Sequence, residues 1–85
     1  MSAAESGLSE IAAIRRLGWS RNDLWMAFLA IGGNGTASDL DQHLRTGNHL
    51  VDAQRDCLAA ALNDGLIDAG DLRRVAYVDE IRVLP

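Results

Sequence analysis

Histidine and cysteine, which most often serve as zinc ligands or as a nucleophile with its base, are scarce in this chain. His43 and His49 are the two histidines among 85 residues, and Cys57 is the single cysteine. A zinc site needs three or four such ligands, and a thiol nucleophile needs a neighbouring base or cation that activates it. Leucine and alanine follow Cys57, so we expect a small buried thiol, and we expect both histidines to be solvated helix residues. The sequence therefore predicts neither a metal centre nor an enzyme.

The segment 32–36, Gly-Gly-Asn-Gly-Thr, has the glycines of a phosphate-binding loop. A loop of that kind follows a strand and places a lysine before its serine or threonine. This chain contains no lysine, and the residues before the segment have a helical pattern. We interpret the segment as a turn that leads into a helix cap, and we predict that the protein uses no cofactor.

The charge balance disfavours nucleic acid as a partner. The net charge is −4, from twelve acidic and eight basic residues, and all eight bases are arginine. Between residues 36 and 64, five aspartates oppose Arg45 and Arg55. A duplex-binding domain usually carries a net positive surface, because contacts to phosphate supply most of its affinity. Nucleic acid therefore stays open only as a second choice.

A reducing cytoplasm is the compartment that the sequence favours. A single cysteine excludes an intramolecular disulfide. The acidic N-terminal residues lack the basic and apolar regions of a secretory signal, and no apolar run approaches the ~18–20 residues of a membrane span. We therefore predict a cytoplasmic protein with no membrane partner.

Apolar spacing and cap residues predict four helices. An apolar residue at every third position marks the first helix, which Ser9 begins and Gly18 ends. Two Ser/Thr-x-x-Asp motifs, starting at positions 20 and 36, are capping boxes that begin the second and third helices. The second helix has a wide apolar face, so we expect it at the centre of the core. The fourth helix is predicted over residues 53–63, capped by Asp52 and ended by Asp64-Gly65.

The C-terminal residues 66–85 favour strands over a helix. Leu66-Ile67 and the segments 75–78 and 81–84 are rich in β-favouring residues, and the later segments alternate in polarity. We predict a short C-terminal β-hairpin, with a fifth helix from Asp71 as the alternative.

The predicted fold class is mainly α. Residues 9–85 are expected to form a small single-domain bundle of four helices, and residues 1–8 a flexible N-terminal tail. A chain of 85 residues is long enough for one small core and leaves no room for a second domain.

The order of helix, glycine-rich turn, helix, helix and short strands resembles the winged helix-turn-helix superfamily over about residues 24–78. The residues that carry the resemblance are Leu29, Gly33-Asn34-Gly35-Thr36, Asp39-Leu40, Leu44, Leu58, Ala61-Leu62 and Gly65-Leu66-Ile67. The resemblance implies that the C-terminal hairpin is the wing, and that the helix opening at Val51 is the one that reads DNA.

That helix, however, is not basic in this chain. Asp52 and Asp56 would face phosphates, which leaves Gln54 and Arg55 to read base edges. In the predicted wing two arginines are offset by two aspartates. The carboxylates oppose the counterion release that drives DNA binding, so the resemblance implies the fold more strongly than the activity.

We therefore predict a small non-enzymatic protein–protein interaction module, a regulator or adaptor that binds a partner protein through an acidic or an apolar helix surface. The alternative is a winged-helix DNA-binding transcription regulator, in which a homodimer would double the number of arginines. Tryptophan and arginine are enriched where interfaces gain most of their affinity, and charge steers association. The candidate partner-binding residues are Trp19, Trp25, Asp52, Arg55, Asp56, Arg73 and Arg74.

Overall fold

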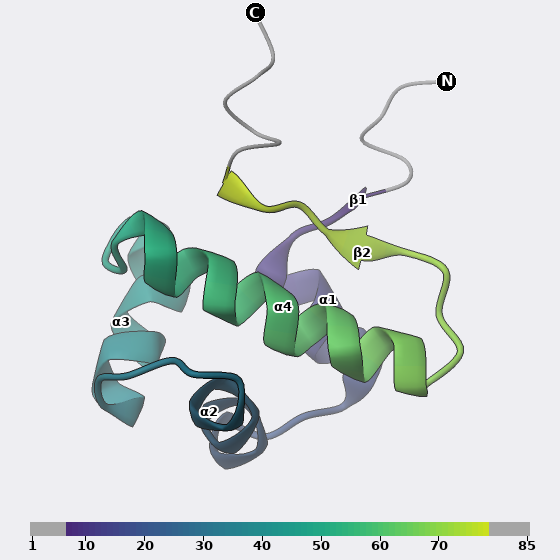
Figure 1. The fold of residues 1–85 in the computed structure, drawn as a ribbon, viewed down its shortest axis with the longest axis horizontal. Coiled ribbons are helices and arrows are strands. Elements are labelled where there is room, and N and C mark those ends of the chain that lie inside the picture. The colour runs from purple at the N-terminus through teal and green to yellow at the C-terminus, as the bar shows by residue number, and fades with distance from the viewer. Residues whose placement is uncertain (1–6, 79–85) are drawn as a thin grey trace, which may run out of the picture.

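Within residues 7–78, which the computed structural model describes, four helices and a two-stranded parallel ribbon make up the fold (Figure 1). In chain order the elements are β1 (Gly7–Leu8), α1 (Glu10–Leu17), α2 (Arg21–Ala30), α3 (Ala37–Thr46), α4 (Asp52–Asp68) and β2 (Arg74–Val75). The predicted mainly α class and four-helix bundle are confirmed. No helix in this part of the chain has the length and apolar character needed to cross a bilayer.

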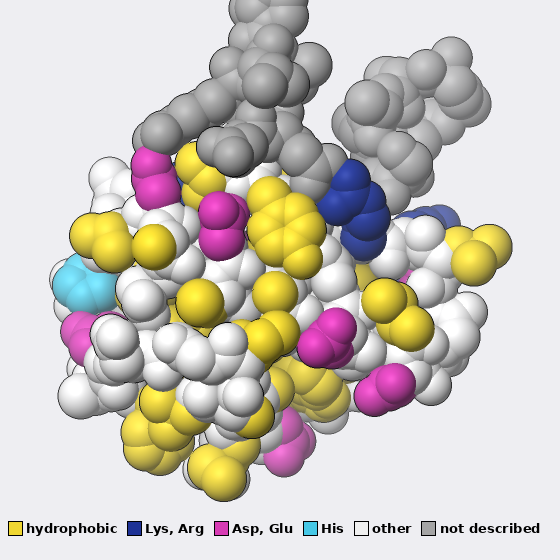
Figure 2. Space-filling model, viewed as in Figure 1, with side chains coloured by type: hydrophobic (Ala, Val, Ile, Leu, Met, Phe, Trp, Pro, Cys, Tyr) yellow, Lys and Arg dark blue, Asp and Glu magenta, His cyan; other side chains and the backbone are white. Residues whose placement is uncertain are grey.

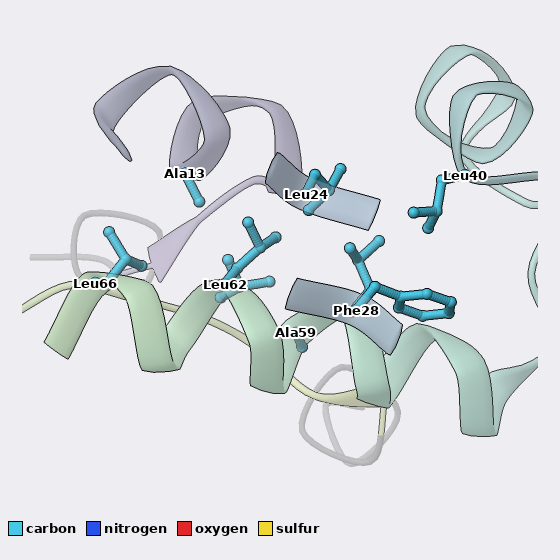
Figure 3. Packing of buried hydrophobic residues seen from close by; sticks show 9 residues of the cluster. Ala13, Leu24, Phe28, Leu40, Ala59, Leu62 and Leu66 are labelled. Carbon is cyan, nitrogen blue, oxygen red and sulfur yellow. The ribbon is translucent and has the colours of Figure 1, made fainter. Parts of the chain in front are cut away.

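α4 is the central element of the fold. It contacts α1, α2 and β2, and Figure 1 shows it running across the middle of the molecule. Its inward face buries Leu62 and Leu66, and Figure 3 shows Ala13 of α1 and Leu24 of α2 pointing toward these leucines. The prediction that the second helix occupies the centre is therefore wrong.

The length of each helix and the distribution of its apolar residues explain this difference. α4 has 17 residues, about 25 Å at 1.5 Å per residue, and spans the whole core, whereas α2 has 10. α2 carries apolar residues around most of its circumference, so only part of them can face inward. Leu24 and Phe28 are buried, while Met26 and Leu29 remain exposed.

The predicted starts of the first three helices are confirmed in atomic detail. The Ser9 hydroxyl accepts from the Ala12 N–H at 3.1 Å and begins α1. α2 and α3 each begin with a reciprocal capping box, Ser20 with Asp23 and Thr36 with Asp39. In each box the hydroxyl accepts from the aspartate N–H and the carboxylate accepts from the cap N–H, so two otherwise unpaired helix donors are satisfied.

The predicted bounds of the fourth helix are wrong at both ends. Val51 occupies the cap position without a side-chain hydrogen bond, and Asp52 is already the first helical residue. The helix passes through Gly65 and continues to Asp68. A Cβ atom on Gly65 would lie 2.6 Å from the ring carbon Cζ2 of Trp19, so this glycine allows a close approach instead of ending the helix.

The C-terminal β-hairpin is not formed within residues 7–78. Leu66-Ile67, predicted as a strand, belongs to α4, and β2 pairs in parallel with β1, with Val75 opposite Leu8. Residues 71–77 include β2, so the alternative fifth helix from Asp71 is not formed there. The predicted strand at 81–84 lies outside the described residues.

The folded domain begins earlier in the sequence than predicted. Gly7 and Leu8 were expected in the flexible tail, but they form β1, and Leu8 packs against the core. Parallel strands need a long crossover connection, and here the whole helical bundle supplies it. The remaining residues of the predicted tail, 1–6, lie outside the described part of the chain.

A buried asparagine fixes β2 against α4. The Asn63 side chain donates to the Val75 carbonyl at 3.0 Å and accepts from the Val75 N–H at 2.7 Å. Three residues later the Val78 N–H donates to Oδ1 of Asp56 at 2.8 Å. The segment after β2 is therefore anchored along α4 by side-chain bonds that no local sequence pattern predicts.

Candidate functional site

The polar side chains at the start of α4 are largely engaged within the protein. Oδ1 of Asp56 accepts from Val78, and Oε1 of Gln54 accepts from the Asn34 N–H at 2.9 Å. Asp52 and Arg55 are half-buried, and Nε of Arg55 is inaccessible to solvent. Figure 2 shows the face with α4 in front: acidic side chains are scattered among apolar ones, and most of the arginine surface in view gathers at one edge, beside β2.

Arg73 and Arg74, the arginines of the predicted wing, are exposed at the other end of α4. The loop before β2 contacts the end of α1, where the Arg16 guanidinium pairs with Asp71. The Arg73 N–H and then the Arg16 side chain lower the pKa of the Asp71 carboxyl by hydrogen bonding. Arg16 and Arg73 line one hollow of about 640 Å³, with the ion pair of Asp71 on its wall. Two of the charged side chains that line this hollow, Arg16 and Asp71, therefore pair with each other and join the loop to α1.

The two tryptophans have different surroundings. Trp19 is half-buried in the loop between α1 and α2, where its ring lies against Gly65. Trp25 is half-buried on α2 and packs against the core, and its Nε1 has no hydrogen-bond partner within residues 7–78. Trp19 lines two surface hollows.

An apolar groove of about 300 Å³ lies between α1, α2 and α3, and we call it the α1–α3 groove. Its apolar lining consists of Ile11 and Ile14 on α1, Leu44 on α3, Leu24 on α2 and Trp19. Leu24 is buried and forms the base, whereas Ile11 is 44% exposed. The groove therefore presents to solvent an aliphatic surface that the bundle itself does not cover.

Cations dominate the rim of the α1–α3 groove. Arg15 of α1, Arg21 of α2 and Arg45 of α3 border it together with one acid, Asp41. Oδ1 of Asp41 lies 3.2 Å from Nη2 of Arg21, and its Oδ2 lies 3.7 Å from Nε of Arg45. Three positive charges against one negative charge leave an excess of two on the rim of a protein whose net charge is −4.

A second hollow, of about 260 Å³, lies between α2 and α4 and shares Trp19 with the α1–α3 groove. Three alanines and Gly65 are half of its eight lining residues, and its charged residues are Asp64 and Asp68. The two hollows therefore differ in the sign of their charge, and the cationic one has the larger aliphatic side chains.

His43 is buried, contrary to the prediction of a solvated helix residue. Its side chain is 0% exposed, and its Nδ1 lies 3.2 Å from the His49 N and 3.3 Å from the Leu50 N. Because both backbone N–H groups donate to Nδ1, the ring proton belongs on Nε2, which lies 3.1 Å from Oε1 of Glu10. The ring thus joins α1, α3 and the loop before α4. Its signal in the sequence is its place three residues after Leu40, on the inward stripe of α3.

His49 is exposed as predicted, but it lies in the loop after α3 and not in a helix, with Nε2 3.1 Å from Oδ1 of Asp39. Hydrogen bonds from the Thr36 N–H and then from the His49 side chain lower the pKa of the Asp39 carboxyl. Cys57 is half-buried and packs against the core. Within residues 7–78 no three side chains of histidine, cysteine or acid type gather where they could hold a metal ion. The hydrogen bonds among Thr36, Asp39 and His49 join the start of α3 to the loop that follows it.

Comparison with protein-family models, with curated proteins and with solved structures finds no match for this chain. The functional argument therefore depends on the geometry of the chain itself.

Proposed function

We propose that this protein is a small non-enzymatic interaction module, a regulator or adaptor, which binds a partner protein in the α1–α3 groove. The observation that carries the proposal is the aliphatic lining of this groove, open to solvent at Ile11. A hollow that combines apolar lining with a few charged groups is typical of a surface that binds another molecule. An amphipathic helix that lies in an apolar groove is one recurring mode of peptide recognition.

The engagement of the α4 side chains supports a protein partner over DNA. The resemblance assigns base reading to Gln54 and Arg55. The Gln54 side chain accepts a hydrogen bond from the Asn34 N–H, and the Arg55 side chain is half-buried with its Nε inaccessible to solvent. Asp56 serves the segment after β2. A helix in this state offers few free donors to a major groove. The single, unpaired Cys57 fits a reducing compartment.

Photo-crosslinking in the source cell tests the proposed surface. Ile11 is replaced by p-benzoylphenylalanine in one variant, and Ile67 in the matched control, because Ile67 is 71% exposed on α4 and is not part of the groove. We expect a discrete crosslinked protein species at position 11 that is absent at position 67. Equal patterns at both positions, or no species at position 11, would contradict the proposal.

A further inference from the structure

We infer that the α1–α3 groove accepts an amphipathic helix that carries acidic residues on both sides of its apolar face. This inference rests on the proposed function and names the chemistry of the partner segment. The groove, its lining and its rim are those defined above.

The shape of the groove favours a helix as the occupant. Helices form its walls, α1 on one side and α3 on the other. α1 has 8 residues, about 12 Å, which corresponds to roughly two turns of a guest helix. A guest helix with apolar residues at positions i, i+3, i+4 and i+7 places them in one row along such a groove. Ile11, Ile14 and Leu44 are the side chains that such a row would meet.

The rim determines the sign of the guest charge. Arg15 lies on the α1 wall and Arg45 on the α3 wall, so an acidic residue on either side of the guest has an arginine to meet. Arg21, at the start of α2, adds a third cation. A guest with basic flanks would meet like charges on both walls, which disfavours association.

The acid on the rim does not neutralise this preference. Asp41 is one carboxylate shared between two guanidiniums, and the Arg21 and Arg45 side chains are 81% and 70% exposed. Ion pairs this exposed are weak, so either arginine can turn to an incoming carboxylate at little cost. Free phosphate or a nucleic acid backbone would use the arginines but leave the aliphatic lining uncovered. The apolar and cationic parts together therefore select a protein segment.

Titration with synthetic peptides tests the inference on the full chain. The probe is a 14-residue helical peptide with leucines at i, i+3, i+4 and i+7 and glutamates on both flanks. A peptide with lysine in place of glutamate, a scrambled peptide of the same composition, and a random DNA duplex serve as comparisons. We expect the acidic amphipathic peptide to bind at least about tenfold tighter than each comparison, and its affinity to fall as salt rises.

Two pairs of variants locate the binding. Ile11→Asp and Arg15→Glu should each weaken the acidic peptide by about tenfold or more, because one removes apolar contact and the other reverses a rim charge. Their controls, Ile67→Asp and Arg73→Glu, make the same changes at exposed positions outside the groove. Arg73 was a candidate from the sequence, but it lines a different hollow, so both controls should leave affinity unchanged. The helical circular dichroism signal of each variant shows that it is folded.

The inference is wrong if the lysine or scrambled peptide binds as tightly, if no peptide binds, or if the controls weaken binding as much as the groove variants. It is also wrong if duplex binds and only Arg15→Glu weakens that binding, since the rim would then serve phosphate. A crosslink from position 11 to a partner segment without acidic flanks would contradict the inference that the occupant is an acidic helix, but it would still support the proposed function. The absence of any such crosslink would remove the proposed function itself.

Discussion

Replacing His43 should reveal how strongly one buried ring holds the loop between α3 and α4. In His43→Leu, the N–H groups of His49 and Leu50 lose their shared acceptor, and Glu10 loses its donor. An unpaired buried donor costs ~1–3 kcal/mol, and these two part-buried N–H groups share one acceptor, so we expect a loss of about 1–3 kcal/mol in the free energy of unfolding. A domain of 85 residues has about 4–13 kcal/mol in total, so this loss is large.

Two further variants separate the ring's two roles. In His43→Asn the amide oxygen can occupy the place of Nδ1 and accept from His49 and Leu50, but the side chain does not reach Glu10. In His43→Gln the amide reaches toward Glu10 and leaves the two N–H groups without their acceptor. Because Glu10 is 22% exposed and can bind water instead, we expect the asparagine variant to be more stable than the glutamine and leucine variants.

Urea unfolding, followed by circular dichroism, measures these differences. The midpoint should fall in His43→Leu while the m-value is unchanged, and the melting temperature should drop by at least about 4 °C, since each kcal/mol shifts it by ~4–8 °C at this size. A His43→Leu protein as stable as the parent would refute the reasoning. So would asparagine and leucine variants that unfold at the same urea concentration, because the acceptor at Nδ1 would then contribute nothing.

Three other predictions concern stability. Asn63→Ala should cost about 2–4 kcal/mol in urea unfolding, because both β2 backbone groups that the asparagine pairs lose their partner. Asn63→Asp should cost at least as much near neutral pH, because an ionised carboxylate at this buried site turns a second acceptor toward the Val75 carbonyl. Gly33→Ala should cost ~1–3 kcal/mol, since the new Cβ would lie 2.6 Å from the buried Phe28 ring; Phe28→Leu in the same chain should recover part of that loss, and a fully additive double variant would contradict the close contact. The pKa values of Asp39 and Asp71 are lowered from 3.8 in the folded protein. The stabilisation that their carboxylates provide is therefore complete well above pH 3.8 and is lost as the pH falls through the lower folded values. In Asp71→Asn the free energy of unfolding should fall less steeply at acidic pH, and an unchanged slope would count against the Arg73 and Arg16 hydrogen bonds.

The sequence alone determined the starts of the first three helices and the fold class. Ser20 and Thr36 bond aspartates three residues away, so their capping boxes depend on contacts that lie within one turn. Gly18 and Gly47 end α1 and α3 with a positive φ, a local requirement that glycine meets without strain. The bulk charge, the scarcity of nucleophiles and the four-helix count are likewise properties of composition and short-range pattern.

The candidate site was only partly predictable. Trp19 was identified from the sequence and lies in the α1–α3 groove, but the rim arginines there, Arg15, Arg21 and Arg45, were not among the candidate partner-binding residues. Their three helices meet only in the tertiary structure, so no spacing along the chain brings these charges together. Conversely, Asp56 was expected to face a partner, but the segment after β2 takes up its carboxylate.

Tertiary structure alone decided the features that depend on residues far apart in the chain. Asp64-Gly65 is a pattern that predicts a helix end, yet α4 continues to Asp68. A glycine stands inside this helix because the ring of Trp19, 46 positions earlier, fills the space that a Cβ would need. Val75 pairs with Leu8 of β1 and with Asn63 of α4, and not with a strand next to it in the sequence. Its buried N–H and C=O groups need hydrogen-bond partners, and the packed bundle places these groups beside it. Local patterns describe which conformation each segment prefers, whereas the choice of long-range partners is made only when the whole core excludes water.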